Sequence, residues 1–493
     1  MKVKTVGLLA TLATLTTSMT VWSITPPGGY GERVQSATAV ALTGPEVEVD
    51  TWRFEAGTAL QVEGRLGHPV LASGQTNETY LYVDVTAPAT AQATAPAPAN
   101  LAIVIDRSGS MSGGRLEKAV EAARGMVRRL RDGDAVSIVT YNTEAETRLA
   151  STTIDSQSRE PVLRALDGIT PLGDTCISCA VEAGMRALRG GREGMVKRML
   201  LLSDGKATAG VRDLAGFERL AAEARDMDCA ISSVGIDIGY NERVMSAIAF
   251  GSNGRHYFVE QPSSIAPVFD QELASLVKTV ATGAEVRVDL APGVEVLEVY
   301  DRAFRREGST LVVPMGSFAS AEDKTLLVRV RLPRGEDGRL PVAKVDVAFD
   351  DLVSGERGHC EGALTASVTS DRASVSSLDP IVGGRVGRAE TSRSLREANA
   401  AFSRGALAEA KQSLASTKSR LQQQKALAAA APKPRRAKLE ADFDRQLAAL
   451  ETAADGFATP PPAAAPGQPA PPPARAGAVQ VRRNEAEAAD LGF

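Results

Sequence analysis

The chain has 493 residues, of which 43% are hydrophobic, 24% are charged and only 4% are aromatic. These fractions are those of an ordinary globular protein, and the length predicts two to four domains at about 100–200 residues each. The 56 lysines and arginines nearly balance the 60 aspartates and glutamates, so the net charge is −4. Because a dedicated nucleic-acid-binding protein needs a large basic surface, no nucleic-acid partner is expected. With only three histidines, a His-rich metal site or a Ser/His/Asp triad has few candidates.

Residues 1–23 have the layout of a secretory signal. The basic start Met1–Lys4 is followed by an uncharged, apolar and hydroxylic stretch up to Trp22, and the small residue Ser23 offers a cleavage position. An uncleaved N-terminal anchor is the alternative interpretation. In both cases we expect the remaining chain outside the cytoplasm, in the periplasm, in the cell envelope or secreted. Membrane contact is expected only through this segment, if it is retained.

Strand patterns occupy two separate parts of the chain. Residues 37–90 contain the alternating run Thr79–Val85, and residues 283–375 contain five short runs of the same kind between Gly, Pro and Asp turns. An antiparallel β-sandwich needs about seven strands, so the earlier region is expected to supply the missing ones. This predicts a sandwich that flanks, or is interrupted by, the segment between the two parts.

That intervening segment, residues 101–282, alternates strands with helices. Leu101–Ile105 and Met199–Leu202 are continuous apolar runs, which are typical of strands buried on both faces of a parallel sheet. An amphipathic helix is predicted from Arg115 to Arg131. The pattern predicts a doubly wound, Rossmann-like α/β domain.

The C-terminal part has two compositions. Residues 386–455 are rich in Ala, Leu, Glu, Lys, Gln and Arg, which favours helices, with a turn at Gly405. Residues 457–493 begin with a Pro- and Ala-rich stretch and end in a polar tail. We therefore predict a helical region followed by a disordered extension.

The chemistry-bearing motif follows the first buried strand. Asp106, Ser108 and Ser110 lie at i, i+2 and i+4 on the loop at the carboxyl end of this strand, where open α/β sheets bind ligands. Asp204 follows the second apolar strand, and Thr175 lies on the loop that opens a helix. All five side chains offer oxygen, which suits Mg²⁺, Mn²⁺ or Ca²⁺ and not copper.

These residues resemble the motif of the von Willebrand factor type A (VWA) family, in which D-x-S-x-S, a Thr and an Asp form a metal-ion-dependent adhesion site. The order Asp106, Ser108, Ser110, Thr175 and Asp204 fills every position of that motif. The resemblance implies that Ser108 and Ser110 bind the ion directly, with Thr175 binding directly or through water. Asp106 and Asp204 would act through water, and one coordination position would accept a partner's carboxylate. The flanking strands are similar in layout to those of exported bacterial members.

The resemblance implies an exported, metal-dependent adhesion or scaffold module that captures an Asp or Glu side chain of a protein partner, with Mg²⁺ as the most suitable ion. A VWA subunit of an ATPase-driven or chelatase-like assembly is the alternative. Metal-assisted hydrolysis needs a base beside an open metal position, and the motif supplies none. Redox work by Cys176 and Cys179 lacks a thioredoxin-like context. We therefore expect no enzyme.

The four cysteines permit two disulfides in an oxidising compartment. Cys176 and Cys179 follow Thr175, so they lie at the metal end of the sheet. Cys229 begins a strand and lies about 17 Å away at the other end, beyond the roughly 7 Å between Cα atoms that a disulfide tolerates. We expect a Cys176–Cys179 bridge and a Cys229–Cys360 bridge between domains, with a free, buried Cys229 as the alternative.

Overall fold

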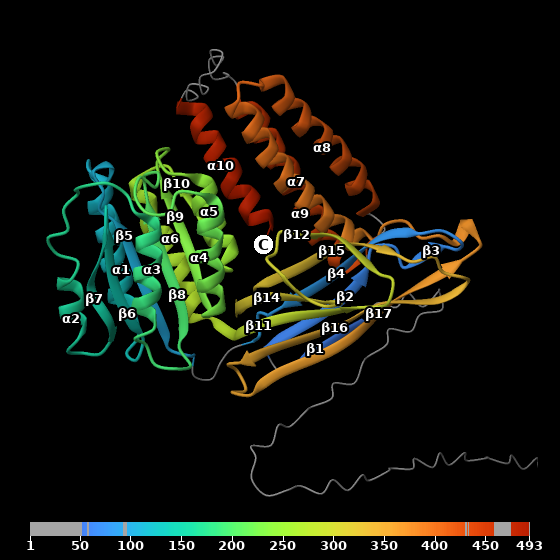
Figure 1. The fold of residues 1–493 in the computed structure, drawn as a ribbon, viewed down its shortest axis with the longest axis horizontal. Coiled ribbons are helices and arrows are strands. Elements are labelled where there is room, and N and C mark those ends of the chain that lie inside the picture. Colours follow the sequence, from blue (N-terminus) through green and yellow to red (C-terminus); the bar gives the residue numbers. More distant parts are fainter. Residues whose placement is uncertain are drawn as a thin grey trace, which may run out of the picture. The chain divides into compact units, whose positions relative to one another are not determined.

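A computed structural model describes residues 52–56, 59–91, 96–428, 431, 433–457 and 475–492 (Figure 1). The predicted leader at residues 1–23 lies outside the described residues, as does the strand region before residue 52. In the part of the chain that is described, no helix has both the length and the apolar character needed to cross a membrane.

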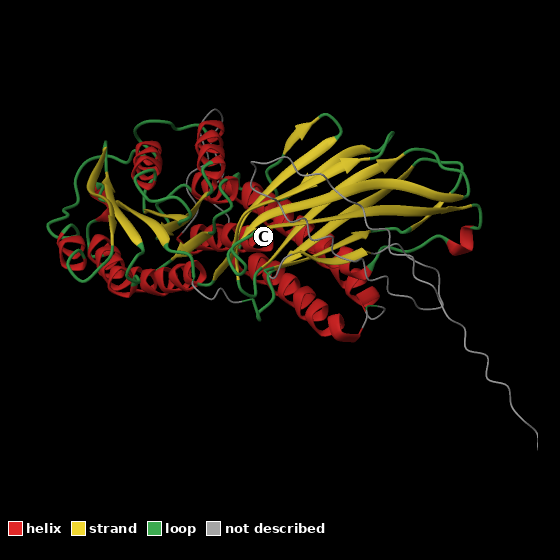
Figure 2. Ribbon diagram, turned by 90° about the horizontal axis from the view of Figure 1, so that it is seen from below, coloured by secondary structure: helices red, strands yellow, loops and turns green. Residues whose placement is uncertain are grey.

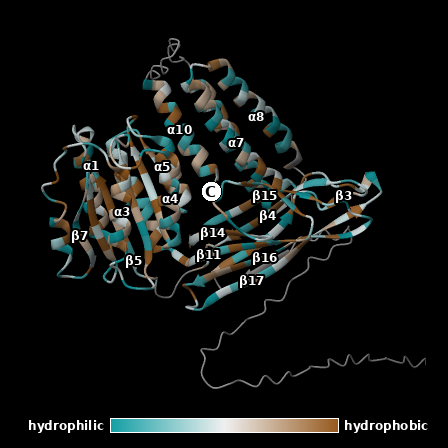
Figure 3. Ribbon diagram, viewed as in Figure 1, coloured by the Kyte–Doolittle hydropathy of each residue, from teal (hydrophilic) through white to brown (hydrophobic). Residues whose placement is uncertain are grey.

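The α/β domain is built on a six-stranded sheet in the order β10-β9-β8-β5-β6-β7. Its strands are β5 (Ala99–Asp106), β6 (Ala135–Tyr141), β7 (Ala145–Thr153), β8 (Val196–Ser203), β9 (Cys229–Ile236) and β10 (His256–Val259). β7 pairs antiparallel with β6, and the other pairs are parallel. Strands β5 and β6 are buried along their whole length, so both faces demand apolar side chains (Figure 3). The sequence did not predict β7, because its half-exposed residues are mostly polar.

Helices cover both faces of this sheet (Figure 2). One hydrophobic core lies under α1 (Arg115–Arg129), α2 (Arg159–Arg164) and α6 (Ile265–Val277). A second core lies on the opposite face under α3 (Ile177–Leu188), α4 (Leu214–Asp226) and α5 (Glu242–Gly251). The predicted doubly wound α/β fold is therefore confirmed.

Two further sheets form the β-rich part. The first has the order β1-β2-β4-β15-β12 and contains β1 (Trp52–Ala56), β2 (Leu60–Leu66), β4 (Asn77–Thr86), β15 (Asp323–Leu332) and β12 (Glu295–Tyr300). The second has the order β13-β14-β11-β16-β17-β3 and contains β13 (Arg305–Glu307), β14 (Thr310–Ala319), β11 (Thr279–Leu290), β16 (Gly338–Asp351), β17 (Arg357–Thr369) and β3 (Val70–Ala72). Side chains of both sheets, such as Val83 and Val286, share one hydrophobic core.

Strand pairing shows that the α/β domain is inserted into this sandwich. β4 precedes that domain in the chain, yet it pairs antiparallel with β15, from Asn77 opposite Leu332 to Thr86 opposite Asp323. Likewise, β3 pairs with β17. The sequence did not predict β17, because large apolar residues are sparse along it and alternate with exposed Arg, His and Glu.

In the described part of the chain after the sandwich, the α-helices are α7 (Pro380–Ser403), α8 (Leu407–Leu427), α9 (Lys433–Gly456) and α10 (Arg475–Gly492). Gly405 has a φ of 83°, a left-handed conformation that favours glycine, and it makes the predicted turn between α7 and α8. The predicted disorder of residues 457–493 is wrong for 475–492. There, Val481, Ala488 and Leu491 of α10 join the core formed by α7, α8 and α9.

The insertion predicts that the later strands cannot fold without the earlier ones. In a fragment of residues 283–375, β15 would lose its partner β4 and β17 would lose β3. We expect this fragment to show no cooperative transition in a thermal circular dichroism scan. As a control, residues 52–91 joined by a Gly/Ser linker to residues 279–375 should melt cooperatively. A cooperative transition from residues 283–375 alone would contradict the insertion.

Candidate metal centre

The predicted metal residues lie at one edge of the α/β sheet. β5 pairs in parallel with β8, with Ile105 opposite Leu202, so Asp106 and Asp204 leave the sheet at neighbouring strand ends. The loop that carries Thr175 lies against the loop that follows β5. Gly109 N–H donates to the Gly173 carbonyl at 3.0 Å, and Leu172 N–H donates to the Arg107 carbonyl at 2.8 Å. Three loops that are distant in sequence therefore meet.

Direct contacts join four of the five predicted residues. Ser110 Oγ donates to Asp204 Oδ1 at 2.5 Å, and the hydroxyl oxygens of Ser108 and Ser110 are 3.1 Å apart. Asp106 lies behind them and accepts the Ser108 backbone N–H at 2.8 Å. Its other oxygen accepts the Ser203 hydroxyl at 2.9 Å. The Asp106 carboxylate thus holds the loop by accepting the backbone N–H of Ser108. The side chains of Ser108, Ser110 and Asp204 form the polar cluster.

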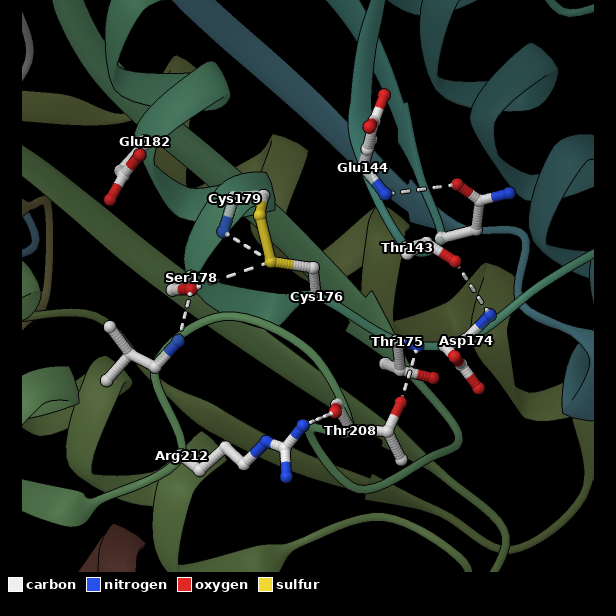
Figure 4. Close-up of a disulfide and its surroundings, with 12 residues drawn as sticks. Thr143, Glu144, Asp174, Thr175, Cys176, Ser178, Cys179, Glu182, Thr208 and Arg212 are labelled. Carbon is white, nitrogen blue, oxygen red and sulfur yellow. Dashed lines mark hydrogen bonds between the residues drawn. A yellow bond between two sulfur atoms is a disulfide. The ribbon is translucent and has the colours of Figure 1, made fainter.

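Thr175 joins the same cluster from the third loop. Its backbone N–H donates to Thr208 Oγ1 at 2.9 Å (Figure 4). A Cβ added at Gly205 would lie 3.2 Å from Thr175 Oγ1 and 3.5 Å from Ser110 Oγ. The two hydroxyls therefore approach the same point, and the missing side chain of Gly205 leaves that point open. Such a cradle of oxygens fits a small hard cation.

The electrostatics of the cluster also suit a cation. Burial raises the pKa of Asp106 to about 6, and repulsion from Asp204 adds to this, although hydrogen bonds from Ser108 oppose both effects. Burial also raises the pKa of Asp204, against the Ser110 hydrogen bond and the positive charge of Arg115. Arg115 Nη1 lies 3.6 Å from Asp204 Oδ2. The two carboxylates are thus only partly compensated by protein charges.

The donor set defines which ions fit. Within the described residues, no group of three or more His, Cys, Asp and Glu side chains is arranged to hold a metal. The cluster instead combines two carboxylates with three hydroxyls, and it contains no nitrogen or sulfur ligand. This composition fits Mg²⁺, Mn²⁺ or Ca²⁺ and disfavours zinc or copper.

Three residues of the centre were not found from the sequence. Ser203 orients Asp106, Gly205 leaves the cradle open, and Arg115 contacts both Asp204 and the Ser110 carbonyl, the latter at 2.7 Å. Ser203 and Gly205 flank Asp204 in sequence, which is a signal that could have singled them out. Arg115 begins α1, and only the folded loop brings it to the cluster.

Of the two predicted disulfides, the structure contains one and lacks the other. Cys176 and Cys179 form a disulfide in the first turn of α3, directly after Thr175, and Cys176 Sγ accepts the Cys179 backbone N–H (Figure 4). Cys229 and Cys360 are free, so the predicted bridge between them is wrong. Cys229 lies in the core under α3, α4 and α5, whereas Cys360 lies in the sandwich core. The two thiols point into different interiors.

These thiols predict a simple titration. The denatured, unreduced protein should react with two equivalents of a thiol reagent, from Cys229 and Cys360, and the reduced protein with four. Denaturation is needed, because burial raises the pKa of the Cys229 thiol to about 12 and suppresses its thiolate. If the denatured, unreduced protein has no reactive thiol, Cys229 and Cys360 are also bridged. If it has four, the Cys176–Cys179 disulfide is absent.

With this geometry established, comparisons identify the domain. Residues 100–271 match the sequence model of the von Willebrand factor type A domain. The chain is 25% identical over 295 residues to an uncharacterized protein of Synechocystis, covering 58% of this chain and 69% of that protein. It is 30% identical over 227 residues to the uncharacterized protein YfbK of Escherichia coli, covering 45% of this chain and 39% of that protein. A von Willebrand factor type A structure from Catenulispora acidiphila has a TM-score of 0.66 at 20% identity, covering 81% of this chain and 92% of that one.

The chain therefore contains a VWA domain, a class that generally serves as a protein-interaction module and often binds a divalent ion. The similarity to the Catenulispora structure covers a larger share of the chain than residues 100–271 alone, and it shows that the fold is shared.

Proposed function

We propose that this protein is an exported, metal-dependent binding module that captures an acidic side chain of a protein partner. The observation that carries the proposal is the convergence of hydroxyls from separate loops on the point beside Gly205. Ser108, Ser110 and Thr175 would hold the ion, and Asp106 and Asp204 would act on it through water. Mg²⁺ suits this donor set best, and Mn²⁺ or Ca²⁺ are alternatives.

The charge balance supports capture of a carboxylate. Two carboxylates formally balance a divalent ion, but Asp106 and Asp204 would act through water, and Arg115, 3.6 Å from Asp204, already offsets part of the Asp204 charge. Positive charge would therefore remain at the open side of the ion and attract an Asp or Glu from outside. Ser110 is exposed while Asp106, Ser108 and Asp204 are buried, so a partner would approach from the Ser110 side. The protein residues would hold the metal ion and orient the partner's carboxylate on it. This is a binding function and not a catalytic one.

An apolar side chain accompanies the polar centre. Leu172 is 66% exposed, and it lies on the loop that carries Thr175 and bonds to the loop that follows β5. Most of this side chain is in contact with solvent, so it is available for apolar contact with a docked protein. The combination favours a partner whose acidic residue has an apolar neighbour.

Metal binding can be tested in the full chain. Mg²⁺ in excess should raise the melting temperature, because a ligand that binds only the folded state stabilises it by about 2.7 kcal/mol at 100 times its Kd. Asp106→Asn keeps the side-chain shape but removes the charge, and it should abolish this gain. Asp174→Asn, which changes an exposed carboxylate beside Thr175, should preserve it. Equal responses of wild type and Asp106→Asn to Mg²⁺ and to EDTA would overturn the proposal.

The partner and the compartment can be tested separately. In a pull-down from the cell envelope, a genuine partner should be retained in Mg²⁺ by wild type and Asp174→Asn, and lost in EDTA or with Asp106→Asn. The uncharged apolar run in residues 1–23 supports the proposed export. A reporter fused after the chain should then be active only outside the cytoplasm. A reporter active only in the cytoplasm would favour the ATPase-associated alternative.

A further inference from the structure

The C-terminal helix α10 contacts the VWA domain as well as the other C-terminal helices. Arg482 is largely buried and donates to the carbonyls of Ile238 and Tyr240 at 2.9 and 3.2 Å. Ser246 of α5 donates to Glu485 at 3.1 Å. On the other side, Ser392 and Asn399 of α7 donate to backbone carbonyls of α10. Helix α10 therefore connects the VWA domain to helix α7.

The first residue of α10 is connected by ion pairs to the candidate metal centre. Arg475 Nη2 lies 2.8 Å from Asp237 Oδ1, and Asp237 Oδ2 lies 2.6 Å from Arg115 Nη2. The other end of the Arg115 guanidinium lies 3.6 Å from Asp204 Oδ2. We call Asp204, Arg115, Asp237 and Arg475 the ion-pair chain. Asp237 follows β9, so it lies at the same sheet edge as the centre.

We propose that cation binding at the metal centre and docking of α10 oppose each other through this ion-pair chain. The inference rests on the proposed metal binding. Arg115 is shared between Asp204 and Asp237, and Asp237 is shared between Arg115 and Arg475. Each charge that draws Asp237 away from Arg115 leaves Arg115 more strongly engaged with Asp204.

The direction of the coupling follows from these charges. When α10 is docked, Arg475 partly neutralises Asp237, and Arg115 keeps its attraction to Asp204. The positive Arg115 then competes with a cation for the Asp204 carboxylate. When Arg475 leaves, Asp237 holds Arg115 alone, and Asp204 becomes freer to serve the ion. Because coupling between two equilibria is reciprocal, a bound cation must weaken the docking of α10 by the same factor.

The chain offers a matched pair of variants. Arg475 and Arg483 both lie on α10, their side chains are 59% and 54% exposed, and each pairs with an acid of the VWA domain. Arg483 pairs with Glu260, which has no contact with Arg115 among the described ion pairs. Arg475→Ala should tighten Mg²⁺ binding by about 1.5- to 5-fold, the range expected for exposed ion pairs, as measured by titration calorimetry of the full chain. Arg483→Ala should leave the Kd unchanged.

Asp237→Asn separates the ion-pair chain from a simple long-range charge effect. This variant leaves Arg115 engaged with Asp204, so Mg²⁺ should bind more weakly than to wild type. Adding Arg475→Ala in that background should then change nothing further. Equal effects of Arg475→Ala and Arg483→Ala, or an Arg475→Ala effect that persists with Asp237→Asn, would overturn the proposal.

The reciprocal effect has its own readout. Saturating Mg²⁺ should speed hydrogen exchange of the amides in residues 475–492 by the factor that Arg475→Ala produces in the Kd. Asp237→Asn should abolish this acceleration. If Mg²⁺ binds and exchange is unchanged, the coupling is wrong while the metal centre stands. If Mg²⁺ does not bind to wild type, or binds equally well to Asp106→Asn, the proposed function itself fails.

Discussion

The parallel pairing of β5 with β8 is the constraint on which the rest of the centre depends. Both strands are apolar and buried on both faces, so their register is set by packing and not by the polar residues that follow them. The pairing ends with Ile105 opposite Leu202, and two aspartates leave the sheet side by side. Two buried carboxylates so close together are unfavourable by themselves. The hydroxyl donors and Arg115 reduce the repulsion between these two carboxylates, and the proposed cation would reduce it further.

Insertion into the sandwich leaves the metal edge of the VWA domain accessible. The domain joins the sandwich at the opposite edge, where Ala99, Val196 and Leu276 pack together with Leu352 of the sandwich. Both connections to the sandwich are therefore at the amino ends of the parallel strands. The loops at the carboxyl ends carry the oxygens and have no role in joining the domains.

The helix α10 is the exception to that separation. It follows a Pro- and Ala-rich stretch, yet it packs into the helical core and donates hydrogen bonds to the VWA domain near β9. Its contacts combine a small apolar stripe with several exposed ion pairs. Exposed pairs contribute little to stability individually. A helix held partly by such pairs is well suited to respond to a change of charge nearby.

The sequence by itself determined the elements whose pattern is local. Continuous apolar runs located β5 and β8, Gly405 located a turn, and the spacing of Asp106, Ser108 and Ser110 located one loop of the centre. The sequence could not reveal β17 or α10, because their apolar residues are small or sparse and become meaningful only against a partner surface. Nor could it separate the thiols of Cys229 and Cys360, since the interior that each side chain enters is a property of packing. Only the tertiary structure connected Arg475 to Arg115 through Asp237, because ion pairs between residues hundreds of positions apart leave no periodic trace in the chain.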